Sequence, residues 1–286
     1  PGESGATVSY CAPSGLLLSQ APYDVLDQRE KLIFMADPTI SHPRVRVDGK
    51  FFRLGDQKFH LKGVAYGPFA PRDGGECFPP PEIAARDFAQ IVELGANVIR
   101  VYTPPPRWVL DLAAQHALKL LIDIPWPKNR CFLDLDKTRQ EAREAVRGIV
   151  RACIGHTAVF AYSVVNEIPP DIVRWSGPRQ VADFIEELVD LAKEEDPDCL
   201  CTFANYPPTE FLRPHNLDFF CFNVYLHNRR PFENYLSRLQ MQADAKPLIL
   251  GEFGVDSISE GEPHKCDLLG WQIESNWADL RLFFLY

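Results

Sequence analysis

The sequence predicts an α/β fold, a (β/α)8 TIM barrel, and three observations support this prediction. Short apolar runs alternate with longer segments of helical periodicity, which is the pattern of a parallel sheet covered by helices. Eight such runs fit between Val45 and Tyr286, a span of roughly 240 residues that is close to the usual size of this barrel. No G-x-G-x-x-G motif follows the first run, which disfavours a nucleotide-binding doubly wound sheet.

Two segments are predicted along the chain. Residues 1–45 are rich in Pro, Ser and Gly and show weak periodicity, so we expect an N-terminal extension of unclear structure. Residues 46–286 are predicted to form the barrel domain. Its opening residues alternate in polarity around the turn dipeptides Asp48-Gly49 and Gly55-Asp56, which predicts a short hairpin ahead of the barrel.

The remaining elements follow from apolar runs and from helix-start signals such as an early Pro or acidic residue. Strands are predicted at 62–66, 97–102, 119–124, 158–165, 200–204, 217–224, 247–251 and 280–285. Helices are predicted at 82–94, 107–117, 136–153, 178–195, 232–244 and 263–275. The chain ends at Tyr286, at the close of the eighth predicted strand, so we expect a barrel truncated after strand eight, without its last covering helix.

Composition excludes several classes of function. The chain of 286 residues carries 39 acidic and 30 basic side chains, a formal net charge of −9, and such a field repels nucleic acid and anionic lipid. We predict no nucleic-acid partner and no membrane contact. The apolar run Gly15–Leu18 is too short for a membrane span or a signal peptide, which leaves the compartment unassigned and slightly favours the cytoplasm.

Cysteine and histidine spacing predicts no metal site. The 8 cysteines are spread along the whole chain without the spacing of a zinc site. A metal-dependent barrel hydrolase would need an H-x-H motif after the first strand, and only His60 is present there. That class of enzyme is therefore a weak alternative.

Two carboxylates end apolar strands, and they are the candidate catalytic residues. Glu167 follows Val164-Val165-Asn166, and Glu252 follows Leu248–Gly251. In a barrel the active site forms at the carboxyl ends of the strands, so both side chains are expected to face one ligand. Alone, either acid could equally cap a helix or pair with an arginine.

A pair of carboxylates at one cleft suits the cleavage of a glycosidic bond. One must be protonated to donate to the leaving oxygen, and the other ionised to attack the anomeric carbon. A separation of about 5–5.5 Å gives retention of configuration, and about 6.5–9.5 Å leaves room for water and gives inversion.

Other strand-end residues are predicted to bind the sugar. Tyr66, Tyr102, Trp126, Tyr206 and Tyr225 offer ring faces, and Asn166, Asn205 and Asn223 offer donors and acceptors for hydroxyl groups. Core packing is the alternative for some of the rings. Arg100 is expected either to form a barrel ion pair or to keep Glu252 ionised, and Tyr225 to donate to the same carboxylate. Asp123 is expected to be a supporting residue.

The ordered motifs carry a resemblance to a known family. Gly63–Tyr66, Gly95–Pro105, Ser163–Glu167 and Gly251–Ser257 resemble the catalytic barrel of clan A glycoside hydrolases, and family 2 in particular. The resemblance implies a retaining double displacement with Glu167 as acid/base and Glu252 as nucleophile. It also implies that Asn166 holds the sugar 2-hydroxyl, and that no metal or organic cofactor is needed.

The chain departs from family 2 in two places. Ser163-Val164-Val165 precedes Asn-Glu where a glycine is usual, and the last eight residues lack the tryptophan expected to form one wall of the site. Tyr102–Pro106 and Asn166–Pro169 look closer to barrels fused to bacterial family 2 glycosyltransferases. That likeness implies trimming or transglycosylation of β-glucan, and a domain of a larger glycosyltransferase-containing protein.

Two functions follow as hypotheses. The first is a retaining β-glycosidase or transglycosylase whose partner is a β-linked oligo- or polysaccharide. The second is a catalytically silent carbohydrate-binding or scaffold barrel, motivated by the missing eighth helix and the missing tryptophan. The sugar, the linkage and the choice between endo and exo action depend on loops that carry no readable pattern.

Overall fold

The computed structural model describes residues 44–72, 74–254, 262–279 and 283–285. Of the predicted N-terminal extension, residues 1–43 lie outside the described residues, and Val45 is the first residue of strand β1. The division into an extension, 1–45, and a barrel domain, 46–286, therefore stays a prediction. No helix in the described part of the chain is both long and apolar enough to cross a membrane.

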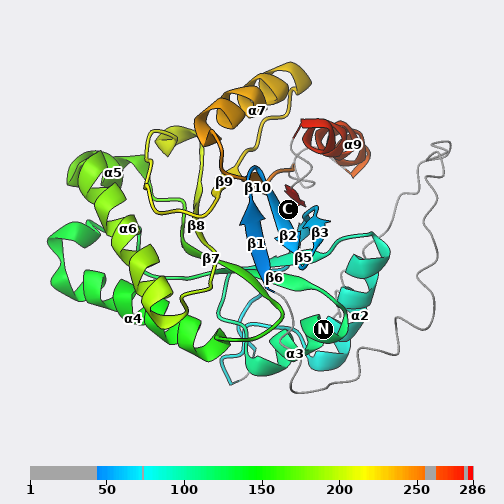
Figure 1. Ribbon diagram of the computed structural model, residues 1–286, viewed down its shortest axis with the longest axis horizontal. Helices are drawn as coiled ribbons and strands as arrows, with labels where there is room; N and C mark the ends of the chain where they lie inside the picture. The colour runs from blue at the N-terminus through cyan, green and yellow to red at the C-terminus, as the bar shows by residue number, and fades with distance from the viewer. Residues whose placement is uncertain (1–43, 73, 255–261, 280–282, 286) are drawn as a thin grey trace, which may run out of the picture. The chain divides into compact units, whose positions relative to one another are not determined.

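The (β/α)8 prediction is confirmed, because eight parallel strands close into a barrel in the order β10-β11-β4-β5-β6-β7-β8-β9 (Figure 1). Each lies where an apolar run predicted it. The strands are β4 (Lys62–Ala65), β5 (Val98–Val101), β6 (Lys119–Asp123), β7 (Val159–Asn166), β8 (Cys201–Asn205), β9 (Phe220–Asn223), β10 (Leu248–Glu252) and β11 (Phe283–Leu285).

Helices cover the outside of this barrel. They are α2 (Pro81–Glu93), α3 (Arg107–Gln115), α4 (Asp136–Cys153), α5 (Pro170–Ser176), α6 (Pro178–Glu195), α7 (Arg229–Ala243) and α9 (Glu262–Asp279), with short 3₁₀ turns η1 (Phe132–Asp134) and η2 (Pro207–Thr209). The apolar faces of α2 to α6 meet the strands in one large core that includes Phe88, Val146 and Leu188, and α7 and α9 pack in a second cluster with β9 and β10. The short helix α5 was not predicted.

The predicted opening hairpin is part of a three-stranded antiparallel sheet, β1 (Val45–Asp48), β2 (Phe51–Leu54) and β3 (Gln57–Phe59). Its Phe52 is fully buried and packs edge-on against Phe160 and Phe219, with ring centroids 5.1 and 5.3 Å apart. Phe160 lies near the start of β7, and Phe219 precedes β9. The sheet therefore closes the amino-terminal end of the barrel.

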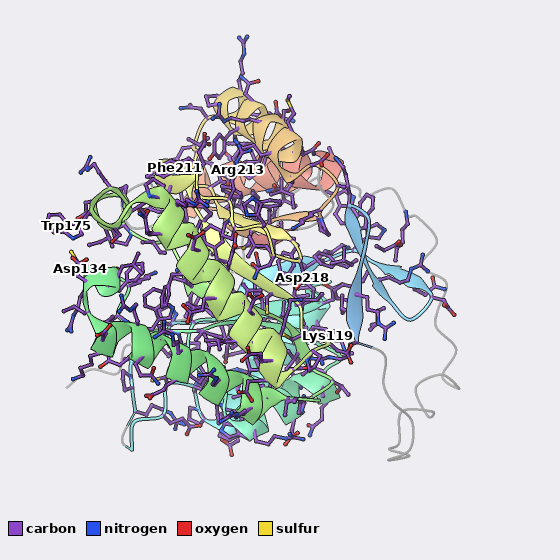
Figure 2. All side chains as sticks on the ribbon, turned by 60° about the vertical axis from the view of Figure 1, so that its left-hand side comes forward. Lys119, Asp134, Trp175, Phe211, Arg213 and Asp218 are labelled. Carbon is purple, nitrogen blue, oxygen red and sulfur yellow. The ribbon has the colours of Figure 1, made fainter. Side chains whose placement is uncertain are left out.

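The opposite, carboxyl-terminal end of the barrel carries the loops that lead into the helices. Figure 2 shows the two ends along α6, with Lys119 and Asp218 at one end and Phe211 and Arg213 at the other. Lys119 begins β6, whereas Phe211 follows β8. The candidate site residues lie at the second end, as expected for this fold.

Candidate active site

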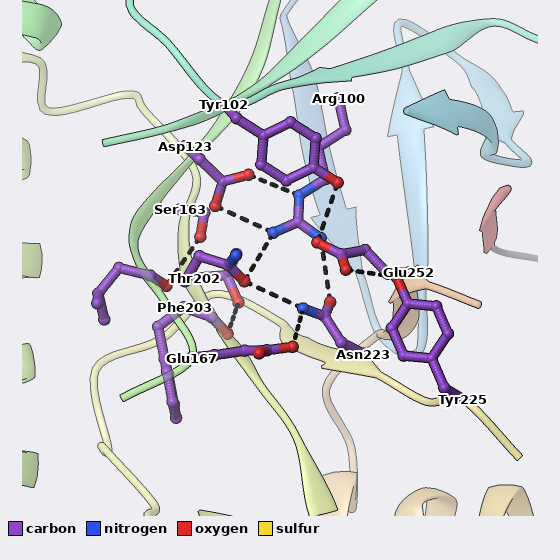
Figure 3. Close-up of polar contacts among 12 residues, drawn as sticks. Arg100, Tyr102, Asp123, Ser163, Glu167, Thr202, Phe203, Asn223, Tyr225 and Glu252 are labelled. Carbon is purple, nitrogen blue, oxygen red and sulfur yellow. Dashed lines mark hydrogen bonds and ion pairs between the residues drawn. The ribbon is translucent and has the colours of Figure 1, made fainter. Parts of the chain in front are cut away.

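Arg100 is the structural centre of the candidate site. It lies on β5, its side chain is fully buried, and it donates to Asp123 through Nε and Nη2 at 2.6 and 3.1 Å. Its Nη1 is 3.0 Å from Glu252 Oε1 and donates to Asn223 Oδ1 at 3.0 Å, while Nη2 also donates to Asn166 Oδ1 at 3.1 Å (Figure 3). One guanidinium thus binds residues from four other strands. The guanidinium forms the expected ion pair inside the barrel, with Asp123, and a second ion pair with Glu252; that it keeps Glu252 ionised stays a prediction.

Glu252 ends β10 and is surrounded by donors. Besides Arg100, Tyr102 donates its hydroxyl to Oε1 at 2.9 Å and Tyr225 donates its hydroxyl to Oε2 at 2.7 Å. The carboxylate is 7% exposed. These contacts place one positive charge and two hydroxyl donors on the carboxylate and hold it in one orientation.

A glycine makes room for this arrangement. A Cβ added to Gly251 would lie 2.5 Å from Cys221 Sγ, 2.8 Å from Arg100 Nη1 and 2.9 Å from Asn223 Oδ1. The pairing of β10 with β9 also shifts register between Leu250 and Glu252. The irregular end of β10 therefore brings Glu252 next to the buried guanidinium, as strand irregularities near active sites often do.

Glu167 follows β7 and has a different environment. Asn223 donates its Nδ2 to Glu167 Oε1 at 2.7 Å, and the backbone of Glu167 has φ of 44°, a region that few non-glycine residues adopt. Burial raises the pKa of Glu167, the hydrogen bond from Asn223 opposes the rise, and the Glu252 charge adds to it. The net direction is upward, which suits a carboxyl that carries a proton.

Asn223 connects the two glutamates. Its Nδ2 donates to Glu167 and to Asn166 Oδ1, and its Oδ1 accepts from Arg100, which contacts Glu252. The structure thus brings Arg100, Asn166, Asn223, Tyr225, Glu167 and Glu252 into one hydrogen-bonded cluster. Glu167 and Glu252 are 85 residues apart in sequence, and they share this cluster because β7 and β10 end at the same edge of the barrel.

Tyr206 lies beside this cluster without joining its hydrogen bonds. It directly follows β8. Burial raises the pKa of its hydroxyl, and the nearby charges of Glu167 and Asp171 raise it further. Because it follows β8 directly, Tyr206 lies at the same end of the barrel as Glu167.

Tyr66 and Trp126 are not brought to the cluster. Tyr66 donates its hydroxyl to Asp87 on α2 at 2.9 Å, and its ring packs edge-on against Phe69 and Phe88. Trp126 donates its indole N–H to the carbonyl of Val164 at 2.9 Å. Both side chains are less than a tenth exposed, so they have the packing role that was the alternative for these rings.

Two residues interact with the glutamates in ways that the sequence did not predict. The sequence predicts that Tyr102 offers a ring face to the sugar, and the structure shows that its hydroxyl binds Glu252. Lys128, in the loop after β6, was not predicted at all. Burial lowers the pKa of Lys128, and the charges of Glu167 and Asp123 raise it, so its ammonium lies within the electrostatic reach of both acids. A lysine in a loop gives no periodic signal that could have revealed it.

Solved structures of known proteins share the fold of this chain. Over 85% of the chain, the structure resembles β-glucuronidases from Bacteroides uniformis (TM-score 0.73, 17% identity) and Ruminococcus gnavus (TM-score 0.72, 17% identity). The chain covers 32% and 45% of those two proteins. It has the barrel fold found in these glycoside hydrolases.

One curated protein is similar to part of the sequence. The chain is 31% identical over 88 residues to the 1,3-beta-glucanosyltransferase gel1 of Aspergillus fumigatus, a match that spans 29% of this chain and 20% of that protein. No protein-family model matches the chain. The structural likeness thus shows the fold, and the sequence match covers a minor part of both chains.

Proposed function

We propose that the chain is a retaining β-glycoside hydrolase or transglycosylase that acts on a β-linked oligo- or polysaccharide. The observation that carries the proposal is the contrast between two carboxylates in one cluster. Glu252 accepts from a guanidinium and two phenols, whereas Glu167 accepts from a neutral amide in a site that raises its pKa. Pairs of acids with divergent environments are the signature of acid and nucleophile roles.

In the first step, a Glu252 oxygen attacks the anomeric carbon and the bond to the leaving oxygen breaks. Glu167 donates its proton to that oxygen, which leaves as an alcohol. The product is an ester between the sugar and Glu252, with inverted configuration at the anomeric carbon. Arg100, Tyr102 and Tyr225 hold the attacking carboxylate in place.

In the second step, Glu167 accepts a proton from water or from a sugar hydroxyl, whose oxygen attacks the anomeric carbon and releases Glu252. The ester is uncharged, so the Glu252 charge that raises the pKa of Glu167 is absent at this stage. The pKa of Glu167 is then lower, so its carboxyl is ionised and able to accept the proton. Water as the acceptor gives hydrolysis, and a sugar hydroxyl gives transglycosylation.

The test uses Glu252→Gln and Glu167→Gln with a panel of aryl β-glycosides and β-linked oligosaccharides. We expect kcat to fall by about three orders of magnitude or more in each, the scale of a lost nucleophile or acid. Glu144→Gln is the matched control, because this glutamate is exposed on α4. NMR of the first product anomer is expected to show the β configuration.

Azide separates the roles of the two acids. With Glu252→Ala, azide is expected to yield an α-glycosyl azide by direct displacement, whereas with Glu167→Ala it intercepts the ester and yields a β-glycosyl azide. Unchanged turnover in either glutamine variant would refute the assignment. A correctly folded wild-type chain that binds β-linked sugar and turns over none of the panel would favour the silent carbohydrate-binding barrel.

A further inference from the structure

An exposed tryptophan lies on the helix that follows Glu167. Trp175 is near the end of α5, and 70% of its surface is exposed. Exposure of so large an apolar ring is unfavourable in water, so a ligand that covers it would gain free energy. The side chain is also held, because its indole N–H donates to Asp134 Oδ2 at 2.6 Å.

Asp134, the hydrogen-bond partner of Trp175, lies next to a buried aromatic ring. Asp134 ends η1, whose Phe132 is fully buried. The Phe132 ring packs against Trp126 and Phe184, with ring centroids 5.1 and 5.5 Å away. The hydrogen bond to Trp175 therefore connects the loop after β6 to α5, and it fixes the orientation of an indole that would otherwise rotate.

A second exposed ring borders a hollow nearby. Phe211, in the loop after β8, is 52% exposed, and it lines a cavity of about 510 Å³ between this loop and the start of α6. Charged groups of both signs line the same cavity, namely Arg179, Arg213, Asp183 and Glu186. Figure 2 shows Trp175 and Phe211 at the same end of α6.

The segments that carry these rings begin next to the candidate active site. Glu167 lies between β7 and α5, the helix that carries Trp175. Tyr206 precedes η2, the turn that leads to Phe211. The loops after β6, β7 and β8 all leave the same end of the barrel, so their residues form one border of the site mouth.

We propose that Trp175 and Phe211 form a second sugar-binding surface for a β-linked glucan that extends beyond the cleaved bond. The inference rests on the proposed function for a β-linked polymer, and the choice of a glucan follows the name of the 1,3-beta-glucanosyltransferase relative. A flat ring held in one orientation fits the apolar face of a pyranose, and nearby carboxylates and guanidinium groups bind its hydroxyls. The mixed signs of those groups favour an uncharged polymer over an acidic one.

The test measures binding without turnover. In a Glu252→Gln background, Trp175→Ala, Phe211→Ala and the double variant are run in native gels that contain a soluble β-1,3-glucan or a mixed-linkage β-1,3/1,4-glucan. We expect Trp175→Ala to weaken retention about tenfold, the effect of losing one stacked ring, and Trp175→Tyr to restore most of it. Met241→Ala, which removes an 85% exposed side chain on α7, is the control.

Catalysis on a short substrate separates this surface from the catalytic pair. In the chain with Glu252 intact, Trp175→Ala and Phe211→Ala are expected to leave kcat/KM for an aryl β-glycoside unchanged and to lower it for the polymer. If the chain hydrolyses nothing but Trp175 still governs retention, the proposed function fails and the surface stands.

Three results would overturn the surface. The first is that neither glucan retains the Glu252→Gln chain. The second is that the double variant binds both glucans as tightly as the parent. The third is that size-exclusion chromatography shows a dimer that Trp175→Ala abolishes. The last result would assign the rings to contact between two copies. Because both rings are exposed, the variants are expected to fold, and circular dichroism checks this.

Discussion

Individual hydroxyl groups should matter at Glu252, because the carboxylate is largely buried. Tyr102→Phe removes one donor to Oε1 and leaves the ring in place. A hydrogen bond to a charged group contributes about 1.5–3 kcal/mol, so we expect kcat to fall by roughly 10- to 100-fold. Steady-state kinetics with an aryl β-glycoside measures the change.

The same substitution at Tyr162 is the control. Its hydroxyl is buried on β7 and has no hydrogen-bond partner among the described residues. Tyr162→Phe is therefore expected to leave kcat unchanged. Equal losses in the two variants would mean that the effect of Tyr102→Phe comes from packing rather than from its contact with Glu252.

Lys128 should set the pH range of activity. Its positive charge lowers the pKa of Glu167, against burial and the Glu252 charge, which raise it. Lys128→Met removes the opposing charge, so the pKa of Glu167 rises further. Glu167 must be protonated to act as the acid, and the alkaline limb of kcat/KM is therefore expected to move to higher pH.

The control for this variant is Lys137→Met on α4, whose side chain is 89% exposed. It is expected to leave the limb in place. A limb that stays fixed in Lys128→Met, or moves to lower pH, would contradict the electrostatic role of Lys128.

At the scale of elements, the end of β10 is the most constrained segment of the site. Gly251→Ala would place a methyl group against Arg100, Cys221 and Asn223. Overpacking of this kind costs about 1–3 kcal/mol, and displacement of Arg100 removes a contact to Glu252. We expect a lower urea midpoint together with a loss of activity at least as large as that of Tyr102→Phe.

Gly148→Ala provides the comparison, since nothing lies within 4 Å of the added Cβ on α4. Alanine favours a helix interior over glycine by about 0.5–1 kcal/mol, so this variant is expected to be slightly more stable and fully active. A Gly251→Ala chain that behaved in the same way would show that the end of β10 has room to adjust.

The barrel elements were predictable because each depends on local periodicity and apolar runs. Helix α5 was not, because it has only 7 residues and begins after Pro169, which leaves too short a window for a periodic signal.

The convergence of Glu167 and Glu252 followed from the rule that strand ends share one edge. Tyr66 and Trp126 obey the same rule, yet their hydroxyl and indole groups bind Asp87 and the Val164 carbonyl. Side-chain direction of that kind is set by tertiary contacts that no spacing encodes.

At the scale of the whole molecule, the two ends of the barrel should separate stability from catalysis. Phe52 fills the closed end, far along the strands from Glu252. Phe52→Ala is expected to lower the free energy of unfolding by about 3–5 kcal/mol, the cost of a large buried ring, and to leave kcat unchanged at temperatures well below unfolding. Urea denaturation and kinetics on the same preparation measure both quantities.

Phe51→Ala is the neighbouring control, because adjacent residues of a strand face opposite sides and Phe51 is only half-buried. A smaller loss of stability is expected. A large fall in kcat for Phe52→Ala under native conditions would show that the two ends are coupled.

Because the Arg100 guanidinium binds side chains on or next to β6, β7, β9 and β10, the catalytic geometry exists only after distant parts of the chain have assembled. An intermediate with half of its strands in place would hold a buried cation without its full set of anions, and it would lack an organised nucleophile. Recovery of enzymatic turnover after dilution from denaturant should thus coincide with the last cooperative phase of refolding, and never precede it.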